Sequence, residues 1–176
     1  RMGRVGKLYK TLEGIEECLK YGLSVKVNMV VIKGENDDEI VKMLEYGVAH
    51  GVEIRYLELM NMGPLHNNDG NNRVSMAEML ERISAKYDVH PVSAEADSTS
   101  LRYGVPGGHF GIIPNNSAPF CSTCSRLRLT SNGQLIGCLS NPEPISVTHL
   151  LGQANPADAL QKLVKKSVSY KQDVTF

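Results

Sequence analysis

Helix and strand patterns alternate through the first half of this chain, and the alternation restricts the fold more than any other feature. Apolar residues at helical spacing predict a first helix over 8–22, and the β-branched run 23–32 predicts a buried strand. A second helix, begun by Asn36 and ended by Gly51, leads to a second strand over 52–60. Short connections between such elements indicate parallel strands joined by right-handed crossovers.

Two parallel strands form neither a stable sheet nor a closed barrel. We therefore expect the first half of a barrel to lie outside this sequence or to come from another chain. The predicted fold class is α/β: the C-terminal portion of an incomplete, partial TIM-like barrel, followed by a β-rich region with a C-terminal helix. The expected domains are the partial barrel over 1–88 and the second region over 89–176.

Turn and cap residues mark the elements that follow. Ser75 is a typical N-cap residue, and Ser131-Asn132-Gly133 is a strong signal for a tight hairpin. The sequence predicts a helix that begins at Ser75, strands over 100–105 and 109–113, a hairpin over 126–138, and a last helix over 156–168 capped by Asn155.

The charges of the chain balance, with Lys+Arg 19 and Asp+Glu 19. This balance argues against a general electrostatic grip on nucleic acid or on an anionic membrane surface. No apolar run approaches the roughly 20 residues that a membrane-spanning helix needs. We therefore expect a cytoplasmic protein that binds neither nucleic acid nor membrane.

Three of the 4 cysteines lie close together, in the pattern C-x2-C-x13-C formed by Cys121, Cys124 and Cys138. Such crowding is typical of a metal or cluster site in a reducing compartment. The predicted hairpin lies between the second and third thiols and would return the third to the first two. Soft thiolates suit zinc or an iron–sulfur cluster, and the spacing leaves that choice open.

The fourth ligand of such a site separates these alternatives. A structural zinc site needs four ligands, and His109 and His149 are the candidates because no further cysteine follows at a matching spacing. Three ligands alone would leave one coordination position open. On a cluster, that position is an iron available to substrate.

Basic residues lie beside this pattern and on the first strand. Arg126 and Arg128 share one face of a predicted strand, and two guanidinium groups there suit phosphate or carboxylate recognition; a solvated strand face is the alternative. Lys26 and Asn28 share a face of the otherwise apolar first strand. Polar side chains that face into a parallel barrel near the carboxyl ends of its strands line its ligand site, whereas an edge lysine simply extends to solvent.

Several ordered segments resemble one enzyme family. Segment 119–139 (PFCSTCSRLRLTSNGQLIGCL) is similar to the C-terminal cluster motif of the GTP 3′,8-cyclases, the radical S-adenosylmethionine enzymes that begin molybdenum cofactor biosynthesis. Segments 25–40 (VKVNMVVIKGENDDEI), 58–63 (ELMNMG) and 109–114 (HFGIIP) resemble other late parts of the same family. The likeness runs from about residue 3 to about residue 168, nearly the whole chain.

The resemblance implies specific ligands and roles. It implies that the predicted barrel is a radical S-adenosylmethionine barrel and that the second region holds an auxiliary [4Fe–4S] cluster whose unligated iron contacts the guanine of GTP. The implied cluster ligands are Cys121, Cys124 and Cys138. The implied GTP contacts are Lys26, Arg126, Leu127 and Arg128, and the implied contact to S-adenosylmethionine is Met60.

The family converts GTP to (8S)-3′,8-cyclo-7,8-dihydroguanosine 5′-triphosphate and so acts as a lyase. Its N-terminal CxxxCxxC motif, which holds a second [4Fe–4S] cluster that cleaves S-adenosylmethionine, does not occur in this sequence, nor does its C-terminal pair of glycines. We therefore expect this chain to bind GTP at the auxiliary cluster, with no catalytic residue assigned. We also expect it to pair with the missing N-terminal half or to form a homodimer.

Two other functions are compatible with the residues. One is a different radical enzyme that has a similar auxiliary cluster and another substrate; the Arg126-Leu127-Arg128 stretch favours GTP over this alternative. The other is a non-catalytic, zinc-stabilised module, for which the metal content is the discriminating measurement.

Overall fold

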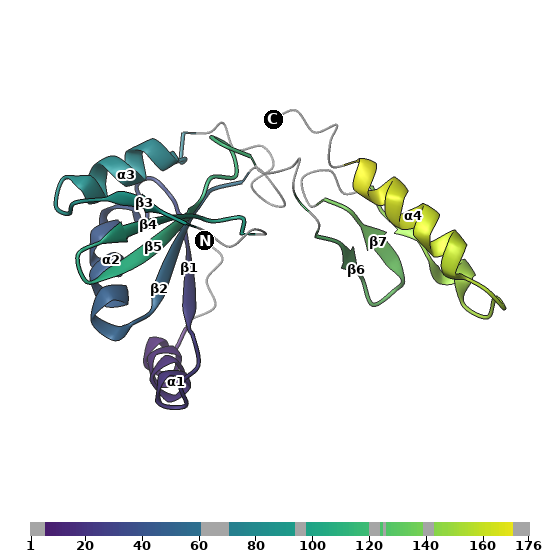
Figure 1. The fold of residues 1–176 in the computed structure, drawn as a ribbon, viewed down its shortest axis with the longest axis horizontal. Coiled ribbons are helices and arrows are strands. Elements are labelled where there is room, and N and C mark those ends of the chain that lie inside the picture. The colour runs from purple at the N-terminus through teal and green to yellow at the C-terminus, as the bar shows by residue number, and fades with distance from the viewer. Residues whose placement is uncertain are drawn as a thin grey trace. The chain divides into compact units, whose positions relative to one another are not determined.

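The chain forms two compact units, each with its own sheet and helices (Figure 1). Unit 1 comprises Arg1–Glu58 and Asn72–Pro114, and unit 2 comprises Leu59–Asn71 and Asn115–Phe176. The division into functional regions at residue 88 remains a prediction. The computed structural model describes residues 6–60, 71–93, 98–119, 124, 126–138 and 143–170.

Unit 1 is built on a five-stranded mixed sheet with the strand order β1-β2-β5-β4-β3. Strands β1, β2 and β5 are parallel, and β4 and β3 continue the sheet in antiparallel fashion. The predicted parallel pairing of the first two strands is therefore confirmed. The bounds are β1 Lys26–Val31, β2 Glu53–Glu58, β3 His90–Val92, β4 Leu101–Val105 and β5 Gly108–Ile113.

Two helices cover one face of this sheet and form the core with it. Helices α2 and α3 lie on the same side of the sheet in Figure 1, and their buried residues join one apolar cluster with the strands. Tyr56 and Phe110 are the largest side chains in that cluster, and both are fully buried. The unit 1 helices are α1 Leu8–Lys20, the 3₁₀ turn η1 Asp37–Glu39, α2 Ile40–His50 and α3 Met76–Ser84.

Local sequence signals explain where these helices begin and end. Ser75 and Glu78 form a capping box at the start of α3, as the sequence predicts for Ser75. Gly51 ends α2 with a φ of 68°, a backbone conformation that favours glycine. The hydroxyl of Tyr56 donates to the carbonyl of Ile40 at 2.7 Å, which ties the sheet to α2, and burial raises the pKa of this phenol.

Two predictions about unit 1 are wrong in detail. The first strand is not buried throughout, because β1 lies at the edge of the sheet and exposes every second residue. Asn36 does not cap the second helix through its side chain. Its side-chain oxygen accepts from the backbone N–H of Ile32 at 2.8 Å, so the residue stabilises the turn after β1 instead.

Unit 2 contains the predicted hairpin and a helix that packs on it. Gly133 has a φ of 73° in the turn, and the backbone N–H of Gly133 donates to Thr130. Helix α4 packs against β7, and it begins after Pro156 without a side-chain cap, so the cap expected at Asn155 is wrong. The bounds are β6 Arg128–Leu129, β7 Gln134–Ile136, β8 Ile145–Ser146, the 3₁₀ turn η4 Thr148–Leu150, and α4 Ala157–Ser169.

The observed architecture is mixed α/β with a sheet that contains parallel strands, which agrees with the predicted class. Among the described residues, no helix combines the length and the apolarity needed to cross a membrane.

Candidate functional site

The β6–β7 hairpin of unit 2 brings thiol and guanidinium groups to one end. Arg128 pairs with Ile136 at the open end of the ladder, so Arg126 and Cys138 follow just beyond the last pair. Cys124 precedes Arg126 by two residues. Cys124 and Cys138 are both half-buried, and neither forms a disulfide. The hairpin thus contributes one thiol from each of its arms at the same end.

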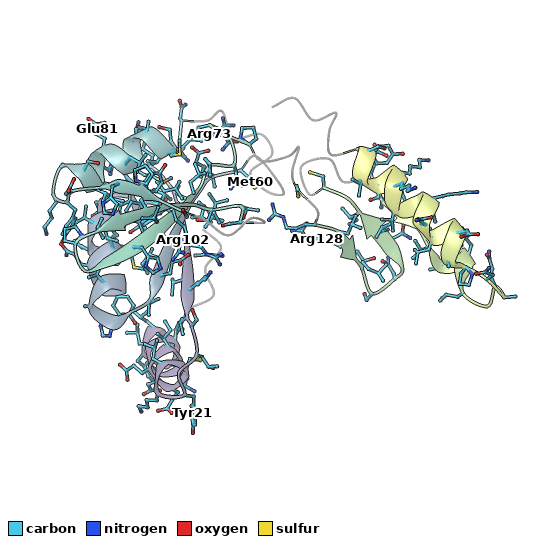
Figure 2. The ribbon with its side chains drawn as sticks, viewed as in Figure 1. Tyr21, Met60, Arg73, Glu81, Arg102 and Arg128 are labelled. Atoms are coloured by element: carbon cyan, nitrogen blue, oxygen red, sulfur yellow. The ribbon has the colours of Figure 1, made fainter. Side chains whose placement is uncertain are left out.

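The prediction that three cysteines hold one metal or cluster stays untested, because Cys121 lies outside the described residues. No group of three or more His, Cys, Asp or Glu side chains with a metal-binding arrangement occurs within the part of the chain that the structure describes. Arg126 and Arg128 are exposed and Leu127 is half-buried (Figure 2 labels Arg128). Strand β6 begins at Arg128, so the shared face of the two arginines remains a prediction.

Met60 and Lys26 belong to different units. Met60 comes two residues after the end of β2 and is half-buried (Figure 2). Lys26 is the first residue of β1, so it stands at the amino end of the parallel strands rather than near their carboxyl ends as expected. The reason is that β1 begins three residues later than the predicted strand, which was expected over 23–32.

The face of the unit 1 sheet that α2 and α3 do not cover is rich in charge. The register places Lys26 opposite Glu53 and Asn28 opposite Arg55, which confirms that Lys26 and Asn28 share a face. Arg55 Nε donates to Asn28 Oδ1 at 2.9 Å. Arg102, labelled in Figure 2, lies on this same face, because it pairs with Gly111 and alternates with the core-facing Tyr103.

Glu53 is the centre of this charged face. Its side chain is only 8% exposed, and one carboxylate oxygen lies 3.0 Å from Arg102 Nη2 and 2.9 Å from His109 Nε2. The other oxygen lies 4.0 Å from Lys26 Nζ. A carboxylate this buried is stable only when it is paired, and three basic side chains from three neighbouring strands provide the pairing.

A cleft of about 350 Å³ opens beside this cluster, and we call it the amino-end cleft because it lies at the amino ends of β1, β2 and β5. Its charged or titratable lining residues are those of the Glu53 cluster. The remaining walls are small residues from the strand starts and from the end of α2. The full lining is Ser24, Val25, Lys26, Gly47, Val48, Gly51, Val52, Glu53, Arg102, Gly107, Gly108 and His109.

The sequence did not single out the Glu53 cluster as a site. Glu53 had no assigned role, and His109 was considered only as a zinc ligand, whereas in the structure His109 contacts Glu53. A signal was present, because Glu53 and Arg55 alternate with Ile54 and Tyr56 in the second strand. This period of two indicates one polar and one apolar face.

Fold and site together define a mixed α/β protein with a thiol- and arginine-bearing hairpin and a separate charged cleft. Residues 52–176 match the family described as Molybdenum Cofactor Synthesis C. The chain belongs to this family.

Two individual relatives support the same family assignment. The chain is 36% identical over 167 residues to a protein of Helicobacter pylori (strain J99 / ATCC 700824) named GTP 3′,8-cyclase, and the match covers 94% of this chain and 51% of that protein. A Staphylococcus aureus (strain JH9) protein of the same name is 40% identical over 131 residues, or 73% of this chain and 38% of the relative. The chain thus spans about half the length, or less, of the curated relatives it matches. The likeness is consistent with the C-terminal part of such a cyclase.

Proposed function

We propose that this chain is the GTP-binding, C-terminal part of a GTP 3′,8-cyclase in molybdenum cofactor biosynthesis. In this proposal Cys121, Cys124 and Cys138 hold an auxiliary [4Fe–4S] cluster. The observation that carries it is the β6–β7 hairpin, which returns Cys138 to the arm that bears Cys124. Relatives at 35–40% identity are named GTP 3′,8-cyclase, which supports the reaction class.

The donor set fits an iron–sulfur cluster. Thiolates are the usual protein ligands of such clusters, and Cys124 and Cys138 are only partly buried. With three thiolate ligands, the cluster would supply an iron with an open coordination position. The protein's own part is to bring the base of GTP to that end of the hairpin.

Basic side chains would bind the rest of the nucleotide. Arg126 and Arg128 are exposed next to the thiols, and guanidinium groups form paired, charge-assisted hydrogen bonds with phosphate. Leu127 between them is half-buried. We include Lys26 among the GTP contacts and Met60 as a contact to S-adenosylmethionine, as the family resemblance implies.

The rest of the barrel would pair with unit 1 along β1. Strand β1 is the outer strand of the sheet, and within the described residues it has only β2 as a neighbour. Val30 on β1 is 41% exposed, and Leu8 at the start of helix α1 is 69% exposed. An unpaired edge with apolar side chains beside it is suited to further strands. These strands would bring the cluster that cleaves S-adenosylmethionine.

Anaerobic reconstitution with iron and sulfide tests this proposal. We expect about four irons and matching sulfide per chain, the content of one [4Fe–4S] cluster. Cys138→Ala should lose most of the bound iron and sulfide. Cys18→Ala is the matched control, because Cys18 is also a free, half-buried thiol but belongs to α1 in unit 1.

The control should retain the cluster content of the unaltered protein. Bound zinc without sulfide would contradict the proposal and favour a zinc-stabilised module. An equal loss of iron in the Cys18 and Cys138 variants would show that iron binding does not depend on the hairpin thiols.

A further inference from the structure

The backbone directly before Met60 is bound by a side chain from far along the sequence. The side-chain nitrogen Nδ2 of Asn116 donates to the backbone carbonyl oxygen of Leu59 at 2.8 Å, across 57 positions. Leu59 follows β2, which ends at Glu58, and Asn116 follows β5, which ends at Ile113. Leu59 and Asn116 both belong to unit 2, so this hydrogen bond joins two segments of the same unit.

This hydrogen bond orients the peptide unit that Leu59 shares with Met60. The peptide bond is planar, so the carbonyl of Leu59 and the N–H of Met60 keep a fixed angle to each other. A donor that fixes the direction of the carbonyl therefore also fixes the direction of the N–H. Leu59 is only 4% exposed, so loss of the donor would remove a hydrogen bond from a largely buried position. Asn116 thus orders the backbone on the amino side of Met60.

The end of β2 is fixed separately, within unit 1. Glu58 is 3% exposed, and its Oε1 accepts from the backbone N–H of Met76 at the start of α3 at 2.8 Å. The backbone that leads to Met60 is therefore held at two successive residues. In open α/β sheets, ligands bind outside the carboxyl ends of the parallel strands. A segment that is already ordered there loses little conformational entropy when it binds a ligand.

We propose that Asn116 is a positioning residue for the contact between Met60 and S-adenosylmethionine. The proposal rests on the function proposed above, which assigns that contact to Met60, and it adds a residue that the family resemblance does not include. Asn116 acts through the carbonyl of Leu59 and needs no contact with the ligand. Met60 itself is half-buried, so part of it is accessible to a ligand (Figure 2).

The methyl resonance of Met60 tests the positioning step without any ligand. In protein labelled with carbon-13 at the methionine methyl groups, Asn116→Ala should move the Met60 signal and leave that of Met79, which is fully buried in α3, unchanged. Met60→Leu assigns the Met60 signal. The matched control is Asn36→Ala, because Asn36 Nδ2 also donates to a backbone carbonyl, that of Val30, at 3.0 Å. We expect this control to leave the Met60 signal in place.

Titration with S-adenosylmethionine tests the consequence for binding. It should shift the Met60 signal of the unaltered protein. Asn116→Ala should raise the Kd read from that shift about tenfold, the factor that corresponds to about 1.4 kcal/mol. Asn36→Ala should change the Kd less than about twofold. Both variants remove an amide donor from a backbone carbonyl, so a general loss of stability would act on both Kd values.

A second measurement avoids the case in which Asn116→Ala fails to fold. In the unaltered protein, S-adenosylmethionine should shift the side-chain amide resonances of Asn116, because the hydrogen bond couples them to the peptide unit before Met60. It should leave those of Asn36 unchanged. Asn116 resonances that stay unshifted while Met60 shifts overturn the proposal, as does a folded Asn116→Ala protein that binds S-adenosylmethionine as tightly as the unaltered one.

Failure of the proposed function would look different. S-adenosylmethionine would then leave the Met60 signal of the unaltered protein unshifted, whereas Asn116→Ala would still move that signal in the absence of ligand. This outcome would overturn the contact at Met60 and leave Asn116 with a structural role only.

Discussion

Among the described glycines of unit 2, Gly137 has the least room for an added methyl group. A Cβ atom at this residue would lie 2.0 Å from the backbone carbonyl oxygen of Ser167 and 2.8 Å from its hydroxyl. Real Cβ atoms essentially never approach another heavy atom within 3.0 Å. Gly137→Ala therefore requires α4 to move away from β7 by about 1 Å or more, because the nearest atom is backbone and has no rotamer to change.

The cost of this movement follows from the loss of close packing. Overpacking of a well-packed contact costs typically about 1–3 kcal/mol, and a backbone clash belongs at the upper end. A loss of about 2–3 kcal/mol in local stability corresponds to roughly 30- to 150-fold faster amide exchange, since about 1.4 kcal/mol is tenfold. We expect this acceleration in peptides from β7 and α4, measured by hydrogen–deuterium exchange with mass spectrometry.

Gly14→Ala is the matched control. It lies in helix α1 and its added Cβ would meet no atom within 4 Å. Alanine favours a helix interior over glycine by about 1 kcal/mol, so this variant should exchange more slowly in α1. Because Gly137 precedes Cys138, we also expect Gly137→Ala to bind less iron after reconstitution. Unchanged exchange in β7 and α4, or equal acceleration in both variants, would refute the reasoning.

Three further predictions concern the framework of unit 1. Tyr56→Phe removes a buried hydroxyl that donates to the α2 backbone and should lower the free energy of unfolding by about 1–3 kcal/mol in urea titrations; no change would show that the bond contributes nothing net. Ser75→Ala removes the cap of α3 and should cost about 1 kcal/mol, with faster exchange confined to that helix. The backbone N–H of Gly34 and the guanidinium of Arg82 lower the pKa of Asp37 below 3.8. The stabilisation is therefore present above 3.8 and is lost as the pH falls through the lowered pKa. The difference in melting temperature between the unaltered protein and Asp37→Asn should shrink over that range, and a difference that is constant with pH would contradict the pairing.

Local signals in the sequence were sufficient for the elements that depend on neighbouring residues. Ser75 caps α3, Gly51 ends α2, and Gly133 turns the β6–β7 hairpin, as expected. Each of these assignments rests on a backbone conformation or a cap that is complete within a few residues.

Elements that depend on distant residues were harder to predict. The apolar run around β1 looked buried, but the strand is at the sheet edge, and only the sheet order decides that. The antiparallel addition of β3 and β4 to a parallel sheet likewise follows from pairing across the chain rather than from periodicity.

The charged cluster around Glu53 shows the same limit for the site. Its members come from β1, β2, β4 and β5, and Glu53 and His109, which contact each other, are 56 positions apart in sequence. No spacing rule connects residues at such separations. Cys124 and Cys138, in contrast, belong to the two arms of one hairpin, so their spacing in the sequence carries the information.

The spectrum of the reduced, reconstituted cluster with and without GTP tests the central claim most directly. If GTP binds at an iron with an open coordination position, GTP should change the electron paramagnetic resonance spectrum, and inorganic triphosphate should not. Arg126→Ala should require more GTP for the same change, because it removes a nearby cation. A cluster whose spectrum is the same with and without saturating GTP would contradict the claim that this chain binds GTP at its cluster.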